Sequence, residues 1–216
     1  MNPAPIPYGA LDLLTLVVLF VGVLRGRKRG LSEELLDALQ WVTIVVAGGL
    51  FYHSVSLTLG QSPLFSRLFY NVASYALIAL VVKLFFSFLK RHLGEKIIGA
   101  DLFGGFEYYL GMMGGMVRFA CVSIFLLNFL HAPLYTTEDL AAQAKYQERW
   151  FSDIRFPTIG TIQQTVFKES VTGWAADKYL ALVMIAPTER KAGVLRHENS
   201  LARRREQSID AMVRGK

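Results

Sequence analysis

The sequence predicts an all-α integral membrane protein, in which a four-helix bundle is followed by a short-helical extramembrane tail. The chain has 216 residues, of which 53% are hydrophobic and 19% charged, against about 25% charged in typical soluble domains. Its apolar residues form long blocks rather than an alternating or helical-period pattern. Four blocks are long enough to cross the hydrocarbon core of a bilayer. They cover residues 6–24, 35–52, 69–89 and 108–130.

The first two predicted spans are joined by a strongly basic connector. The first span has one charge, Asp12, and the residues before it lack the basic start of a secretory signal peptide. The connector then carries Arg25, Arg27, Lys28 and Arg29. Glu33 and Glu34 follow at the expected start of the second helix, where carboxylates are favoured. The second span also has a single charge, Asp37.

The third and fourth predicted spans each contain one cation. Lys83 is the charge of the third span, and a basic connector with Lys90, Arg91 and Lys96 follows it. Arg118 is the charge of the fourth span. At 100° per residue, a single helical stripe holds Glu107, Gly111, Gly115 and Arg118. The Gly-x-x-x-Gly spacing allows close helix approach, so these glycines are interpreted as packing contacts rather than as part of a permeation path.

Two polar levels are expected within the bundle. Arg118 and Asp12 lie at similar depth if the spans are antiparallel, and we hypothesise that they form an intramembrane ion pair. A second layer is expected nearer the cytoplasm, formed by Glu34, Asp37, Lys83 and Glu107. The alternatives are that Lys83 snorkels to the membrane surface and that Glu34 only caps its helix.

The basic residues of the connectors predict the topology. Short cationic loops stay in the cytoplasm, so both termini are expected on the outer side, in the periplasm of a bacterium. Because the cations lie in connectors, they indicate topology rather than a nucleic-acid-binding surface. Residues 1–131 are therefore the predicted membrane domain. Residues 132–186 are expected to form an amphipathic or small helical segment, and residues 187–216 a basic, flexible tail.

Two stretches resemble the colicin V production protein family. The run Arg29-Gly30-Leu-Ser-Glu-Glu34 is similar to the R-G-x-x-x-E element between that family's first two helices. Residues 107–118 resemble the D-R-x-x-G-x-x-x-G-x-x-R-G signature, with Glu107 in place of Asp, Tyr108 in place of the first Arg and Phe119 in place of the final Gly. The resemblance covers about residues 8–131. It implies a bacterial inner-membrane protein linked to toxin production and envelope homeostasis, without an established biochemical activity.

Enzymatic function is not expected. The sequence lacks the common zinc-hydrolase, serine-hydrolase and nucleotide-binding motifs. Its four histidines are scattered and Cys121 is the single cysteine, so no metal or cofactor is predicted. Two classes remain: a non-catalytic membrane component that docks an envelope or secretion partner through residues 132–216, and a small ion- or proton-coupled transporter or channel subunit. Because four helices enclose little space, the transporter requires a homo-oligomer.

Overall fold

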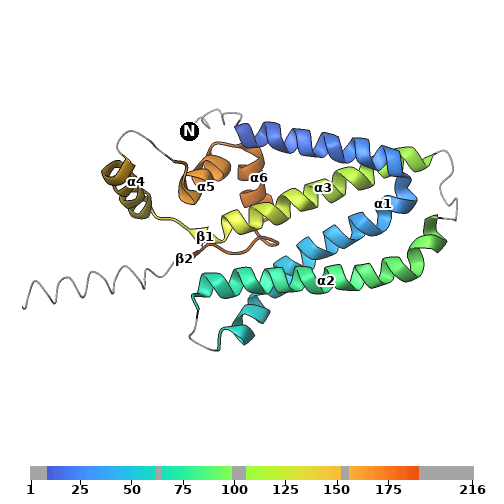
Figure 1. Ribbon diagram of the computed structural model, residues 1–216, viewed down its shortest axis with the longest axis horizontal. Helices are drawn as coiled ribbons and strands as arrows, with labels where there is room; N and C mark the ends of the chain where they lie inside the picture. The colour runs from blue at the N-terminus through green and yellow to red at the C-terminus, as the bar shows by residue number, and fades with distance from the viewer. Residues whose placement is uncertain (1–8, 62–64, 99–105, 152–155, 190–216) are drawn as a thin grey trace, which may run out of the picture.

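The computed structural model describes residues 9–61, 65–98, 106–151 and 156–189, and most of that length is helical (Figure 1). The described residues form six helices: α1 (Ala10–Leu59), α2 (Arg67–Ile98), α3 (Glu107–His131), α4 (Thr137–Phe151), α5 (Ile159–Lys168) and α6 (Val171–Tyr179). Two short strands, β1 (Pro133–Leu134) and β2 (Thr188–Glu189), pair in parallel. The predicted helical character is confirmed.

Helix α1 contains residues 10–24 of the first predicted span and the whole of the second, and a sharp bend at Gly30 separates the two. The backbone of Gly30 has φ 74° and ψ 172°, which is not helical. Positive φ is readily adopted by glycine because it has no Cβ. The bend divides α1 into a first arm, residues 10–29, and a second arm, residues 31–59, and turns the chain back on itself.

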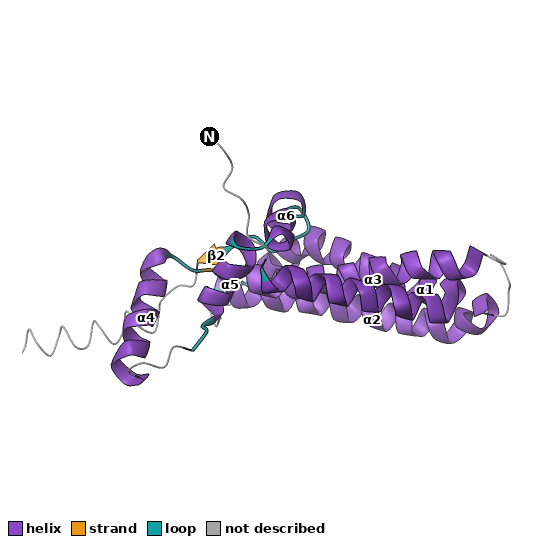
Figure 2. Ribbon diagram, turned by 90° about the horizontal axis from the view of Figure 1, so that it is seen from above, coloured by secondary structure: helices purple, strands orange, loops and turns teal. Residues whose placement is uncertain are grey.

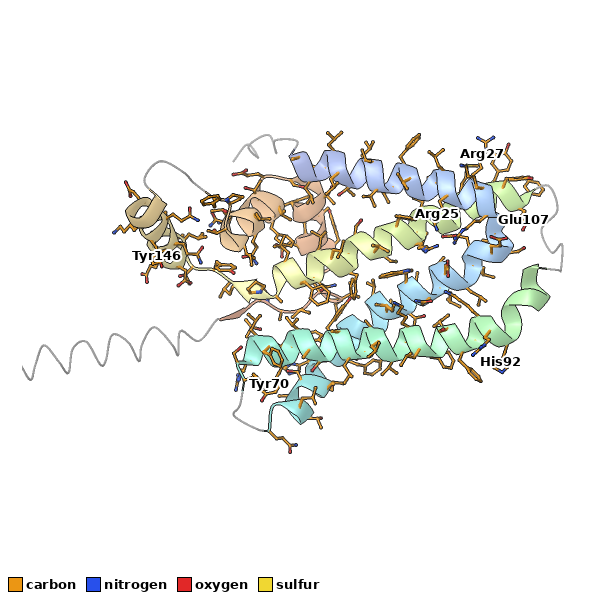
Figure 3. All side chains as sticks on the ribbon, in the orientation of Figure 1. Arg25, Arg27, Tyr70, His92, Glu107 and Tyr146 are labelled. Carbon is orange, nitrogen blue, oxygen red and sulfur yellow. The ribbon has the colours of Figure 1, made fainter. Side chains whose placement is uncertain are left out.

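The two arms, α3 and α2 lie side by side and form the main body of the molecule (Figure 1). The first arm packs against α3, while the second arm lies between α3 and α2. Helices α2 and α3 contact each other where Tyr75 packs against Phe125 and Phe129 and accepts a hydrogen bond from Asn128. Because these helices have few other contacts in the described residues, a compact four-helix bundle is not confirmed. The two cationic connectors lie at one end of this body, marked by Arg25 and His92, and Tyr70 lies at the other (Figure 3).

Two helices of the described chain are long and apolar enough to cross a membrane. They are Arg67–His92 within α2 and the whole of Glu107–His131. Large apolar side chains also project from the main body into its surroundings, among them Leu16, Phe20 and Leu84, each at least 60% exposed. Such a surface is favourable against lipid and unfavourable against water.

The chain after α3 folds back onto the end of the helices opposite the bend. The segment after α6 inserts between them, and Ile185 is fully buried against Tyr52, Tyr75 and Ala132. The Ile185 amide donates to Oδ1 of Asn128 at 2.8 Å. Helix α4 instead stands away from the main body (Figure 2). Most of the predicted basic tail, residues 190–216, lies outside the described residues.

Candidate functional site

The candidate site is a group of five charged side chains near the bend of α1, which we call the ion cluster: Arg29, Glu34, Asp37, Lys90 and Arg118. Its two carboxylates, Glu34 and Asp37, lie three residues apart and so project from one face of the second arm. Glu34 is 0% exposed and Asp37 is 20% exposed. The cluster therefore begins with two acidic groups that need cationic partners.

Arginines from two different helices bridge these carboxylates. Nη1 of Arg118, from α3, donates to Oε1 of Glu34 and to Oδ2 of Asp37, both at 2.8 Å. Nη1 of Arg29, from the end of the first arm, lies 3.3 Å from Oδ2 of Asp37 and 3.6 Å from Oε2 of Glu34. Since the bend reverses the chain between Arg29 and Glu34, it brings the two residues together.

Helix α2 contributes the third cation. Nζ of Lys90 donates to Oδ1 of Asp37 and, at 2.6 Å, to Oε1 of Gln40. The ion cluster thus connects both arms of α1 with α2 and α3. With three cations and two carboxylates, it carries a formal charge of +1.

The burial of Glu34 makes its ion pair with Arg118 energetically sensitive. Removing one partner from a buried ion pair costs about 3–5 kcal/mol, because the remaining charge is left without compensation. The arrangement suits two roles: it can hold four helical stretches in register, or it can form part of an ion path between the helices. Within the described residues, no group of three His, Cys, Asp or Glu side chains could hold a metal ion.

Beside the cluster, glycines allow the first arm and α3 to approach closely. A Cβ added at Gly26 would overlap the backbone carbonyl of Gly111, and one at Gly115 would overlap that of Gly22. Glu107 lies at the bend, where its Cγ is 2.9 Å from the position of a Cβ built on Gly30. We call these contacts the glycine seam. It brings the two stretches that carry the family resemblance into direct contact.

The predicted ion pair between Asp12 and Arg118 is wrong. Asp12 accepts hydrogen bonds from Ser170 and Thr172 at the start of α6, including one of 2.8 Å from the Thr172 amide. The register of the seam explains the difference. Because Gly22 lies level with Gly115 on an antiparallel helix, Arg118 is level with residue 19, and Asp12 lies about 10 Å further along the axis.

The expected second polar layer is only partly present. Glu34 and Asp37 do lie together, but the described residues show no ion pair of either with Lys83 or Glu107. Lys83 is exposed on α2. Its place beside Asp37 is taken by Lys90, which lies seven residues later on nearly the same helical stripe. On α2, the contact with Asp37 therefore lies about two helical turns nearer the connector than predicted.

Sequence reasoning missed Lys90, Gln40 and the two seam glycines of the first arm. Lys90 was assigned to a connector, although its spacing from Lys83 was a usable signal. Gly22 and Gly26 repeat the small-residue spacing of Gly111 and Gly115. That pairing of two Gly-x-x-x-Gly runs was present in the sequence.

Fold and site together define a helical protein with two apolar helices suited to a membrane and a buried ion cluster between its helices. The chain belongs to the colicin V production protein family, whose model matches residues 11–153. This confirms the resemblance and extends it beyond α3 through α4. No curated protein and no solved structure matches the chain.

Proposed function

We propose that this protein is a non-catalytic, multi-pass component of the bacterial inner membrane that supports colicin V production or envelope homeostasis. The proposal rests on one observation, namely that the charged side chains of the ion cluster form ion pairs with one another. Glu34, Asp37 and Arg118 are held by one another and by Arg29 and Lys90. Such a cluster serves to fix helices in register.

The proposed orientation places the bend of α1 in the cytoplasm and the chain after α3 in the periplasm. It is supported by the gathering of both cationic connectors at one end of the main body (Figure 3). The cap formed by α5 and α6 lies at the opposite end (Figure 1). Helix α4 would then extend into the periplasm.

Helix α4 is the proposed docking surface for an envelope or secretion partner. It stands away from the main body and is exposed along most of its described length. Its attachment is limited: Leu140 approaches Gly160, and Gln147 donates to the Phe156 carbonyl at 3.0 Å. An exposed helix with few internal contacts can bind a partner without disturbing the membrane helices.

Complementation tests this role. A colicin V-producing strain without its own family member would receive the wild type, Lys145→Glu on α4, or Lys168→Glu on α5 as a matched control. Colicin V release and membrane-protein level would be measured together. We expect Lys145→Glu to reduce release at an unchanged protein level and Lys168→Glu to behave as wild type. Equal release from all three would contradict docking through α4.

A transporter or channel subunit is the second candidate, and one observation favours it. Glu34 is 0% exposed, and its Oε2 has no hydrogen-bond partner among the described residues, although Arg29 lies 3.6 Å away. Charged residues buried between membrane helices often mark ion pathways. In this function the ion cluster would change partners during transport, and ion flux would depend on Glu34.

A further inference from the structure

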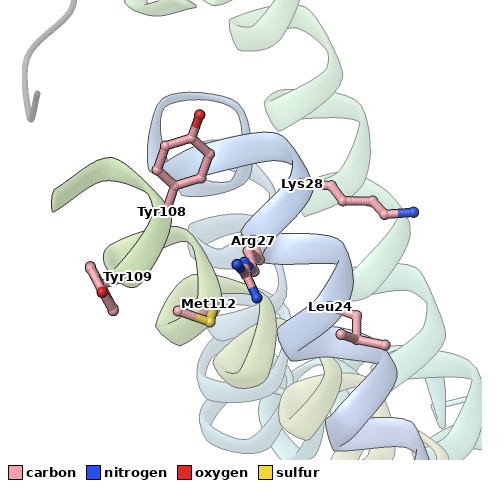
Figure 4. A pocket seen from close by; sticks show the side chains of 6 residues that line it. All are labelled: Leu24, Arg27, Lys28, Tyr108, Tyr109 and Met112. Atoms are coloured by element: carbon pink, nitrogen blue, oxygen red, sulfur yellow. The ribbon is translucent and has the colours of Figure 1, made fainter. Parts of the chain in front are cut away.

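We propose that the protein has a binding site for the phosphodiester headgroup of an anionic phospholipid, at the end of the main body next to the bend of α1. The site is an open pocket of about 800 Å³ between the first arm and the beginning of α3 (Figure 4). It is lined by Leu24, Arg27, Lys28, Tyr108, Tyr109 and Met112. The inference rests on the membrane placement proposed above and adds a ligand to it.

The lining has the charge that a phosphate group requires. Arg27 and Lys28 are exposed and have no ion-pair partner among the described residues. Among the described residues, no carboxylate lines the pocket. The nearby Glu107 packs against Gly30 on the side of the glycine seam. Two cations that form no ion pair with another described residue thus line the pocket. An arginine is well suited to bind phosphate oxygens with two parallel hydrogen bonds.

The other lining residues match the remaining parts of a lipid. Tyr108 and Tyr109 are exposed in the first turn of α3, at the end of a helix long enough to cross a membrane. Tyrosines at such positions lie at the level of lipid headgroups. Leu24 and Met112 lie one turn further into their helices and supply apolar surface for the acyl chains (Figure 4). A soluble phosphate compound would not use that apolar surface.

Lipid binding by the purified full-length chain in detergent tests the proposal. Native mass spectrometry would measure the apparent Kd for phosphatidylglycerol and for phosphatidylcholine, with and without millimolar inorganic phosphate. We expect a preference for phosphatidylglycerol that inorganic phosphate does not abolish. Equal binding of the two lipids would overturn the proposal. Full competition by inorganic phosphate would show a free-phosphate site and overturn the lipid assignment.

Variants locate the binding to the pocket. Arg27→Gln and Lys28→Gln should each weaken phosphatidylglycerol binding about fivefold, which corresponds to about 1 kcal/mol per cation near an anionic surface. Arg25→Gln is the matched control, because Arg25 belongs to the same exposed basic run but does not line the pocket. A loss for Arg25→Gln equal to that for Arg27→Gln would overturn the proposal.

Two further measurements keep the test interpretable. Circular dichroism would verify that each variant keeps its helical content, and Tyr109→Leu, which leaves the charge unchanged, should also weaken headgroup binding. If Tyr109→Leu and Arg27→Gln both bind phosphatidylglycerol with the affinity of the wild type, the pocket is not the binding site. Because binding is measured in detergent, its failure is distinct from a failure of the colicin V complementation test.

Discussion

Removing the cation of α3 tests whether the ion cluster holds the helices together. Arg118→Met keeps most of the side-chain volume but leaves Glu34, which is 0% exposed, without its 2.8 Å partner. Breaking a buried pair costs about 3–5 kcal/mol. Since Arg29 remains 3.6 Å from Glu34, we expect a loss of about 3 kcal/mol in the free energy of unfolding, at the low end of that range.

Equilibrium unfolding in mixed detergent micelles, followed by circular dichroism, would measure this loss. Lys83→Met is the matched control, because it removes an exposed cation of another membrane helix and should change stability by less than about 0.5 kcal/mol. The double variant Glu34→Gln/Arg118→Met removes both charges and should recover most of the loss. The reasoning is refuted if Arg118→Met matches Lys83→Met, or if the two substitutions of the double variant are simply additive.

Three further predictions concern the packing around the cluster. Gly115→Ala should lower the free energy of unfolding by about 1–3 kcal/mol, because the added Cβ would overlap the Gly22 carbonyl. Gly114→Ala is the control, since its Cβ would lie an ordinary 3.6 Å from the nearest side-chain atoms. Equal unfolding curves for the two variants would contradict the close packing of the glycine seam. Asp12→Ala removes the acceptor of the Thr172 amide and should weaken the start of α6 by about 0.5–2 kcal/mol, seen as faster hydrogen exchange of that amide. Its effect should be additive with that of Arg118→Met if the two residues are independent. Asn128→Leu removes the acceptor of the buried Ile185 amide. The segment after α6 should then be cleaved faster in limited proteolysis, whereas an unchanged cleavage rate would show that other contacts hold this segment in place.

The sequence was sufficient to predict the helical character and the family. Long apolar blocks require helices in a bilayer, because only helices satisfy the backbone within one segment. The stripe of Gly111, Gly115 and Arg118 was also readable, since helical periodicity fixes which residues share a face. Its partner stripe, with Gly22 and Gly26, was missed, although the same rule applies to it.

The midpoints of the predicted spans were not sufficient to predict which residues of neighbouring helices lie at the same depth. The midpoint of a span is uncertain by several residues, and each residue shifts the axial position by 1.5 Å. That uncertainty led to Asp12 as the partner of Arg118 instead of Glu34 and Asp37. The sharp bend at Gly30 also moved Arg29 from a solvated connector into the cluster.

The packing of the chain after α3 depends on contacts that no local pattern reveals. Ser170 and Thr172 bind Asp12 although they lie 158 and 160 residues later in the sequence. Ile185 is buried in the core, where its amide donates a hydrogen bond to Asn128. Polar residues such as these are common at helix ends and turns, so their long-range partners cannot be read from composition or periodicity.

Ion flux across a membrane tests the central claim most directly. The purified full-length protein would be reconstituted into liposomes, and pH- and potential-sensitive dyes would report flux under imposed gradients, with Glu34→Gln and Arg118→Met measured in parallel. If the ion cluster serves to hold the helices, wild-type liposomes will show no flux above protein-free liposomes. Flux that is present in the wild type and lost in folded Glu34→Gln would contradict a structural role and establish the cluster as part of a transport path.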